Sequence, residues 1–252
     1  MWWAYAGALF IGISLGLLGS GGATLTVPLL VYLVGEPEKL AIAESLGIVG
    51  IISLIGSIPY IRNKEIHYVS LFYFGIPGMI GAYSGAGLSR FLSGNTQLLV
   101  FSVVLLISAT MMIRNSGKDF EPKPSDPSRL MLILEGLVVG HLTGLVGVGG
   151  GFLIVPTLVL LVGLPMRVAV GTSLMIVAWQ SFAGFYKYLD VLAELDLHIN
   201  WHIILAFTSI GILGSFAGNK IGTKISQKNL KRGFGYFLVL MGFFILYKSV
   251  LE

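Results

Sequence analysis

Long apolar segments separated by short polar stretches dominate this chain. A helix needs about 20 such residues to cross a hydrocarbon core about 30 Å thick. The pattern therefore predicts an all-α polytopic membrane protein. The apolar segments are residues 4–34, 41–60, 68–88, 97–113, 130–163, 167–188, 201–223 and 233–250.

Two of these segments, 4–34 and 130–163, are too long for one straight crossing. As a single helix, the first would measure about 46 Å. Both contain glycine clusters, Gly19-Ser-Gly-Gly22 in the first segment and Gly147–Gly151 in the second. Because glycine weakens a helix and allows the backbone to turn, we predict a break at each cluster. The pattern alone allows either a kinked crossing or a re-entrant hairpin.

The chain is also an internal duplication. Adding 128 to a position in residues 16–35 gives its partner in residues 144–163, and 13 of these 20 positions are identical. After Tyr188 an insertion of five residues shifts the offset to 133. We expect two homologous repeats, 1–113 and 130–252, joined by a polar linker at 114–129 and forming one integrated membrane domain. Each repeat should contain one Gly-Gly broken helix or hairpin and three transmembrane helices.

The positions of lysine and arginine indicate the orientation. If both broken segments are hairpins, the repeats are inverted, and 12 of the 16 cations fall on one side. If both cross once, the cations divide eight and eight. Cytoplasmic loops carry an excess of lysine and arginine, so the first arrangement is favoured. It predicts inverted repeats, a cytoplasmic linker and both termini outside.

Composition supports the membrane assignment and narrows the function. Charged residues make up 11% of the chain, against roughly 25% in soluble domains. The net charge of +4 does not indicate nucleic-acid binding, because the cations lie in short loops. The absence of cysteine excludes disulfides and thiolate metal sites. We expect a lipid bilayer as partner, no cofactor or metal, and no enzymatic activity, since no catalytic set of residues stands out.

The two glycine breaks supply the candidate chemistry. A helix that restarts inside the membrane presents free N–H groups and the positive end of its dipole, and two such ends suit a small anion. Neighbouring hydroxyls, Thr26 among them, and one amide add hydrogen bonds without a permanent charge. The predicted substrate-binding residues are Ser20, Gly21, Gly22, Thr24, Pro28, Ser45, Gly149, Gly150, Gly151, Pro156, Thr172, Ser173 and Gln180.

A plainer interpretation stays open for these residues. The glycines can serve helix packing alone, and the hydroxyls can bond to their own helix backbone. Two ionisable residues, Glu44 and His141, are candidates for proton coupling. The alternatives are an interfacial Glu44 and a neutral His141 bonded to a carbonyl. Trp201, Tyr186 and Tyr188 are expected in the interfacial aromatic belt.

The second glycine motif and the segment after it resemble a known family. Gly144-Leu-Val-Gly-Val-Gly-Gly-Gly151, Pro156 and Ala169-Val-Gly-Thr-Ser-Leu174 are similar to motifs of the sulfite exporter TauE/SafE family of membrane transporters. The first copy departs from the pattern, with Ala23 for the third glycine and Glu44-Ser45 for the usual Thr-Ser.

The resemblance implies transport of small sulfur-containing or organic anions, such as sulfite, sulfoacetate or other sulfonates, across the cytoplasmic membrane. No ATPase motif is present, so a secondary transporter is expected. A negative-inside potential drives anions outward by about 2.3 kcal/mol per charge per 100 mV, which favours export. A passive anion channel and a structural membrane subunit are the alternatives, and the oligomeric state stays open.

Overall fold

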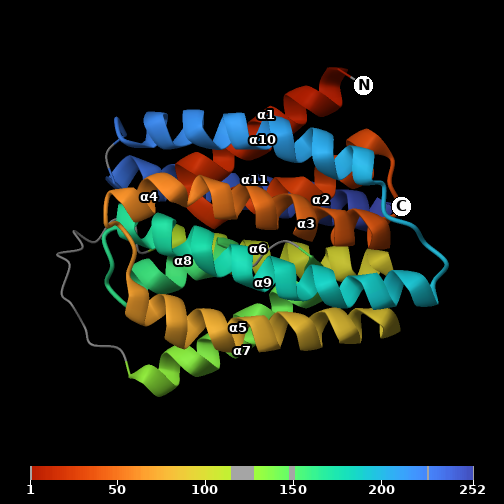
Figure 1. Cartoon of the computed structure of the whole chain (residues 1–252), viewed down its shortest axis with the longest axis horizontal. Helices are drawn as coiled ribbons and strands as arrows, with labels where there is room; N and C mark the ends of the chain where they lie inside the picture. Colours follow the sequence, from red (N-terminus) through yellow and green to blue (C-terminus); the bar gives the residue numbers. More distant parts are fainter. Residues whose placement is uncertain (1, 115–127, 148–150, 226, 252) are drawn as a thin grey trace.

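The computed structural model describes residues 2–114, 128–147, 151–225 and 227–251, and within these ranges the chain forms helices without strands. The helices lie along one common direction (Figure 1). The first half contains α1 (Trp2–Leu18), η1 (Gly19–Leu25), α2 (Thr26–Leu29), η2 (Leu30–Val34), α3 (Glu38–Gly56), α4 (Ile58–Arg62), α5 (Tyr68–Leu88), η3 (Ser89–Phe91) and α6 (Gly94–Arg114). The second half contains α7 (Arg129–Val146), α8 (Gly151–Leu160), α9 (Met166–Glu194), α10 (Trp201–Gly222) and α11 (Gln227–Leu251).

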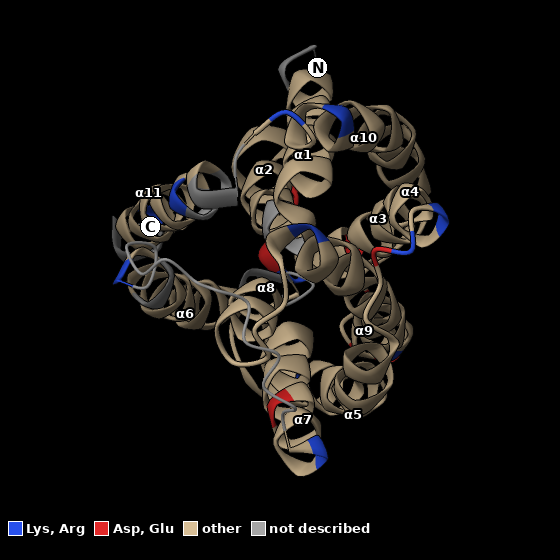
Figure 2. Cartoon of the chain, turned by 90° about the vertical axis from the view of Figure 1, so that its left-hand side faces the viewer, with Lys and Arg blue, Asp and Glu red and all other residues tan. Residues whose placement is uncertain are grey.

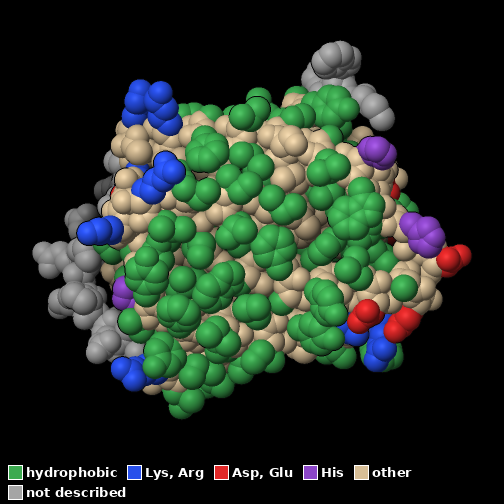
Figure 3. Space-filling view, viewed as in Figure 1, with side chains coloured by type: hydrophobic (Ala, Val, Ile, Leu, Met, Phe, Trp, Pro, Cys, Tyr) green, Lys and Arg blue, Asp and Glu red, His purple; other side chains and the backbone are tan. Residues whose placement is uncertain are grey.

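The surface has the character of a membrane protein. Large apolar side chains such as Phe72, Leu205, Leu213 and Leu240 are exposed, and apolar side chains cover most of the face in Figure 3. By length and composition, four of the described helical segments can cross a membrane: Glu38–Arg62, Arg129–Val146, Met166–Glu194 and Trp201–Gly222. The predicted all-helical membrane protein is therefore confirmed.

Both long apolar segments break at the predicted glycines. The helix α1 ends at Leu18 and Gly19 has a φ of +68°, while α7 ends at Val146 and Gly147 has a φ of +76°. Backbone in this left-handed region favours glycine, because a Cβ would crowd the following carbonyl. The first break continues as a 3₁₀ helix, η1, before α2 restarts; residues 148–150 of the second break lie outside the described residues.

The first broken segment returns to the end where it began. In Figure 1, α1 starts at the end of the bundle that carries both termini, and α3 starts at the same end. The segment between them, α1–η1–α2–η2, therefore runs into the bundle and back. The helices α7 and α9 both start at the opposite end of the bundle. The segment α7–α8 therefore enters from that end and returns to it.

Glycines join the two halves by backbone contact. A Cβ on Gly12 of α1 would lie 2.0 Å from the Gly211 oxygen of α10, and one on Gly140 of α7 would lie 2.1 Å from the Gly78 oxygen of α5. The duplication offsets relate Gly12 to Gly140 and Gly78 to Gly211. The same contact is thus made twice, each time between the first helix of one half and the third long helix of the other half.

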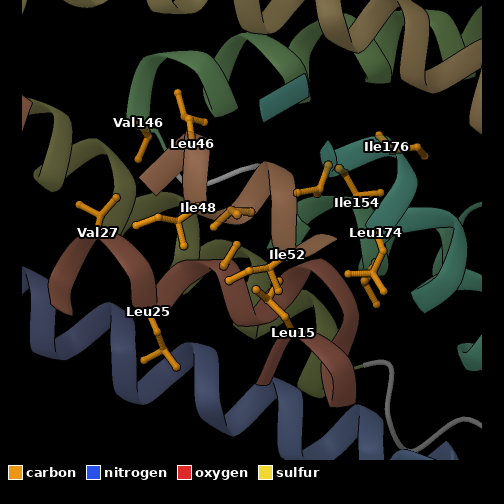
Figure 4. Close-up of a cluster of buried hydrophobic side chains, with 14 of the residues drawn as sticks. Leu15, Leu25, Val27, Leu46, Ile48, Ile52, Val146, Ile154, Leu174 and Ile176 are labelled. Atoms are coloured by element: carbon orange, nitrogen blue, oxygen red, sulfur yellow. The ribbon is translucent and has the colours of Figure 1, made fainter. Parts of the chain in front are cut away.

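The equivalent helices α3 and α9 pack against each other in opposite directions. Gly47 faces Phe185, Gly50 faces Phe182, and Ser57 Oγ lies 3.0 Å from Met175 Sδ. Residue numbers along the contact therefore rise in α3 and fall in α9, so the two helices are antiparallel. Between them and the broken segments lies a core of aliphatic side chains (Figure 4). The five-residue insertion lengthens α9, which continues to Glu194. In the first repeat α4 already ends at Arg62, the position equivalent to Asp190 of α9.

We predict that Gly140→Ala destabilises the bundle, because the added methyl group would overlap the Gly78 backbone and push α7 from α5. Overpacking of this kind costs about 1–3 kcal/mol. The measurement is the thermal unfolding of the purified protein in detergent. Gly233→Ala is the matched control, since a Cβ there meets no atom within 4 Å. Equal stability of the two variants would contradict the close helix contact.

Candidate substrate site at the paired helix breaks

The two breaks meet inside the bundle. The segment η1 contacts both α8 and α9, and α8 contacts α6 and α9 as well. Figure 2, which looks along the helices, shows α8 at the centre, while the α6–α11 pair forms one side of the bundle. The restart of the second long segment therefore lies against the break of the first.

Equivalent serines lie where the two breaks rest on the neighbouring helices. A Cβ on Gly19 would lie 2.9 Å from Ser173 Oγ, and one on Gly147 would lie 2.1 Å from Ile42 Cγ2. Ser173 Oγ donates to the Val170 oxygen at 2.8 Å. Ser45 Oγ hydrogen-bonds to the Ile42 oxygen at 2.8 Å and also to the Gly147 oxygen. Both predicted site residues thus lie at the breaks, where their hydroxyls bind backbone carbonyls.

Buried tyrosines satisfy the carbonyls at the ends of α1 and α7. Tyr60 Oη donates to the Gly16 oxygen at 3.2 Å, and the equivalent Tyr188 Oη donates to the Leu145 oxygen at 3.3 Å. Gln97 Nε2 donates to the same Leu145 oxygen and to Tyr188 Oη. The expectation of Tyr188 in the aromatic belt was wrong, since the side chain is fully buried. The sequence did hold a sign of this structural role, because tyrosine occurs at the matched positions 60 and 188 of the two repeats.

The candidates Glu44 and Thr172 occupy equivalent positions and make equivalent bonds. Glu44 Oε1 accepts from the Asn200 N–H at 2.8 Å, and Thr172 Oγ1 accepts from the His67 N–H at 2.9 Å. Asn200 and His67 immediately precede α10 and α5. Each side chain therefore connects its helix to the start of a helix in the other half. Glu44 is fully buried, and its Oε2 has no hydrogen-bond partner in the structure.

Gln180 and His141 both lie at the α5–α7 packing. Gln180 is fully buried; its Oε1 accepts from Thr143 Oγ1 at 3.4 Å, and a Cβ on Gly78 would lie 2.0 Å from its Nε2. The Nε2 atom has no hydrogen-bond partner. His141 Nδ1 pairs with the exposed Ser84 Oγ at 2.9 Å, so its partner is a hydroxyl and not a carbonyl.

The remaining candidates belong to the two broken segments. Thr24, Pro28 and Pro156 are buried, and Gly151 begins α8. Ser20, Gly21 and Gly22 lie in η1, while Gly149 and Gly150 lie outside the described residues. Thr26, the first residue of α2, is fully buried and its Oγ1 has no partner. The matched pair Ser53 and Ser181 also has buried, unpartnered hydroxyls.

Unpartnered buried polar atoms are rare in folded proteins and call for a ligand or water. Among the described residues they lie on α2, α3, α6, α7, α9 and α10. Their side chains are hydroxyls and amides without charge, apart from the carboxyl groups of Glu44 and Glu135. The arrangement can bind a small polar solute by hydrogen bonds and release it again.

An apolar helical bundle in which two broken helices meet is the architecture of membrane transport proteins. The chain belongs to the sulfite exporter TauE/SafE family, whose model matches residues 4–245. The resemblance drawn from the glycine motifs is thus confirmed.

Relatives named "Probable membrane transporter protein" support this membership. One from Methanocaldococcus jannaschii is 30% identical over 254 residues, covering 94% of each chain. One from Xylella fastidiosa strain Temecula1 is 29% identical over 247 residues, covering 95% of this chain and 92% of the relative. One from Bacillus subtilis is 27% identical over 266 residues, covering 96% of each chain. No solved structure matches the chain. The names indicate transport and not catalysis.

We predict that Ser45→Ala lowers the thermal stability, because it leaves the Gly147 carbonyl with one partner fewer at a buried turn. The expected cost is about 1–3 kcal/mol. Ser209→Ala is the control, since Ser209 Oγ is exposed and bonds only to the Leu205 oxygen of its own helix. Melting curves of the two variants in the same detergent measure the difference, and identical curves would exclude Ser45 as a support of the break.

Proposed function

We propose that this protein is a secondary transporter that carries small sulfur-containing or organic anions across the cytoplasmic membrane, with its helices crossing that membrane several times. The anion binds between the restarts of the two broken helices. The observation that carries this proposal is the contact of η1 with α8, beside the buried and unpartnered Thr26 hydroxyl. Two helix N-termini carry about half a positive charge each and together offset roughly one negative charge.

The absence of lysine and arginine from both broken segments, 4–34 and 130–163, agrees with reversible binding. A buried arginine would hold an anion by charge-assisted bonds, which are about twice as strong as neutral ones. Neutral donors release the anion more readily. In this proposal Ser20, Thr24 and Thr26 donate hydrogen bonds on one side. Backbone N–H groups of residues 149–151 donate on the other.

The other candidates act at a distance from the anion. Ser45 holds the turn at Gly147 by a hydrogen bond, and Ser173 packs against the turn at Gly19. Pro28 and Pro156 shape the restarted helices. Thr172 holds the start of α5 in the first half, and Gln180 packs between α5 and α7. Glu44, with one unpartnered oxygen, is the better candidate for proton coupling, because His141 already pairs with Ser84.

We also propose that residues 1–113 and 130–252 are inverted repeats joined by a cytoplasmic linker at 114–129. The opposite directions of α3 and α9 support inversion, since the two helices occupy equivalent places in the duplication. On the face in Figure 3, most lysine and arginine side chains gather at one end, while acidic and histidine side chains gather at the other. With the cationic end inside, the membrane potential favours export.

Transport assays test the function. In liposomes we expect saturable flux with counterflow for sulfite, sulfoacetate or a related anion. Thr26→Val should weaken the apparent affinity about fivefold, because one hydrogen bond contributes about 1 kcal/mol. Thr110→Val is the control, since Thr110 Oγ1 is exposed and bonds only to the Leu106 oxygen of its own helix. A conductance that does not saturate would indicate the alternative, a passive anion channel.

Cysteine labelling tests the orientation in a chain that has no cysteine of its own. Lys64→Cys and Lys224→Cys should react only from the cytoplasmic side, and Ser93→Cys only from the outside. All three positions are exposed. Labelling of Lys64→Cys and Lys224→Cys from opposite sides of the membrane would rule out the inverted arrangement.

A further inference from the structure

A cavity of about 680 Å³ opens at the end of the bundle that carries both termini. The first broken segment contributes both of its arms, with Ala4 and Tyr5 from α1 and residues 32–34 and 36 from η2 and the turn after it. The start of α10 closes the third side through Asn200, His202, Ile203, Ala206 and Phe207. The cavity therefore lies between the two arms of the segment that turns at the first glycine break.

Ala206, a small residue, belongs to the lining of this cavity. The offset of 133 relates Ala206 to Tyr73 of α5, at the opposite end of the bundle. The Tyr73 ring lies 5.3 Å from the Arg129 guanidinium, so an aromatic ring and a cation occupy the equivalent place there. A tyrosine is thus compatible with this position of the fold. Alanine at 206 leaves the space open.

The lining has both apolar and polar character. Its apolar surface comes from Leu33, Val34, Ile203 and Phe207. Its polar groups, those of Asn200, His202, Tyr5 and Tyr32, can hydrogen-bond the polar part of a ligand. The Lys248 Nζ lies 5.4 Å from the centre of the Tyr32 ring, which places a cation beside the cavity. Glu36 belongs to the lining and opposes a ligand of high negative charge.

These features distinguish between small anions. Ligand pockets of about 300–1,000 Å³ enclose molecules of drug size, so a bare inorganic oxyanion would fill little of this cavity. The apolar walls gain free energy only from a ligand with an apolar part, and Glu36 favours a single negative charge over two.

We propose that this cavity is an outer binding site for the apolar part of an organic monoanion, a sulfonate or a carboxylate, on its path to or from the helix breaks. The proposal rests on the proposed transport function. It adds a second site, distinct from the anion site at the breaks. It also assigns Ala206 as the residue that determines the size of ligand accepted.

Binding of a homologous series to the full-length protein in detergent tests this proposal. The probes are sulfite and the methane-, propane- and pentanesulfonate ions, with the matching carboxylates. We expect the dissociation constant to fall with chain length, by up to about fourfold for each buried methylene group. Ala206→Tyr should remove this gain while the binding of sulfite and methanesulfonate stays unchanged.

Leu205→Tyr is the matched control, because it adds the same side chain one position away on the exposed face of α10. It should keep the dependence on chain length. Ala206→Leu provides a smaller filling residue if the tyrosine variant does not fold, and it should reduce the gain in part. The proposal of the outer site would be overturned, with the proposed transport function left standing, by either of two results. One is a wild-type dissociation constant that does not depend on the length of the ligand's alkyl chain, and the other is an Ala206→Tyr variant that keeps this dependence. Failure of all these anions to bind would refute the proposed function, and the outer site with it.

Discussion

The fold depends on satisfying the backbone groups that a broken helix releases inside a membrane, because lipid offers them no hydrogen bonds. At the end of α1, the Gly16 carbonyl accepts from Tyr60; at the end of α7, the Leu145 carbonyl accepts from Tyr188 and Gln97. The electronegative ends of both half-helices are thus covered by protein side chains. The helices that follow the breaks, η1 with α2 and α8, are the ones to which the proposed function assigns the anion.

Those supports come from the opposite half of the chain as often as from the same half. Ser45 binds the Gly147 carbonyl, and Glu44 and Thr172 each hold the start of a helix in the other repeat. The glycine contacts of α1 with α10 and of α7 with α5 also cross between the halves. The second break is therefore completed by residues of the first repeat, and each repeat holds the start of a helix in the other. The duplication yields one interlocked membrane domain in place of two separate units.

The helices and breaks were predictable from the sequence because they follow from local properties. Segment 68–88 coincides with α5, and both breaks occur at the expected glycines, since hydropathy and glycine act over a few neighbouring residues. The supports were not predictable. Gln97 and Tyr188 reach a carbonyl 48 and 43 residues away, and nothing near them in the sequence indicates that partner. Thr172 was predicted to bind substrate and Glu44 to couple protons, and nothing in the sequence indicated that both would bond at helix starts.

The two repeats differ at the two ends of the bundle. At the linker end, Arg167 makes a bidentate pair with Glu65, with Nε–Oε1 at 2.8 Å and Nη2–Oε2 at 2.9 Å. The equivalent positions at the other end carry Lys39 and His198, which cannot form such a pair. A bidentate guanidinium–carboxylate contact fixes geometry more firmly than a single bond.

The ion pair ties α9 to the loop before α5 at the linker end. At the other end a cavity lined by Ala206 opens and no equivalent ion pair can form, while the bond of Glu44 to the Asn200 N–H has its own equivalent in the bond of Thr172 to the His67 N–H. An inverted repeat with identical halves would be equally open or closed at both ends. The unequal side chains at equivalent positions therefore make the two ends of the bundle different, with an ion pair at the linker end and a cavity at the end that carries the termini.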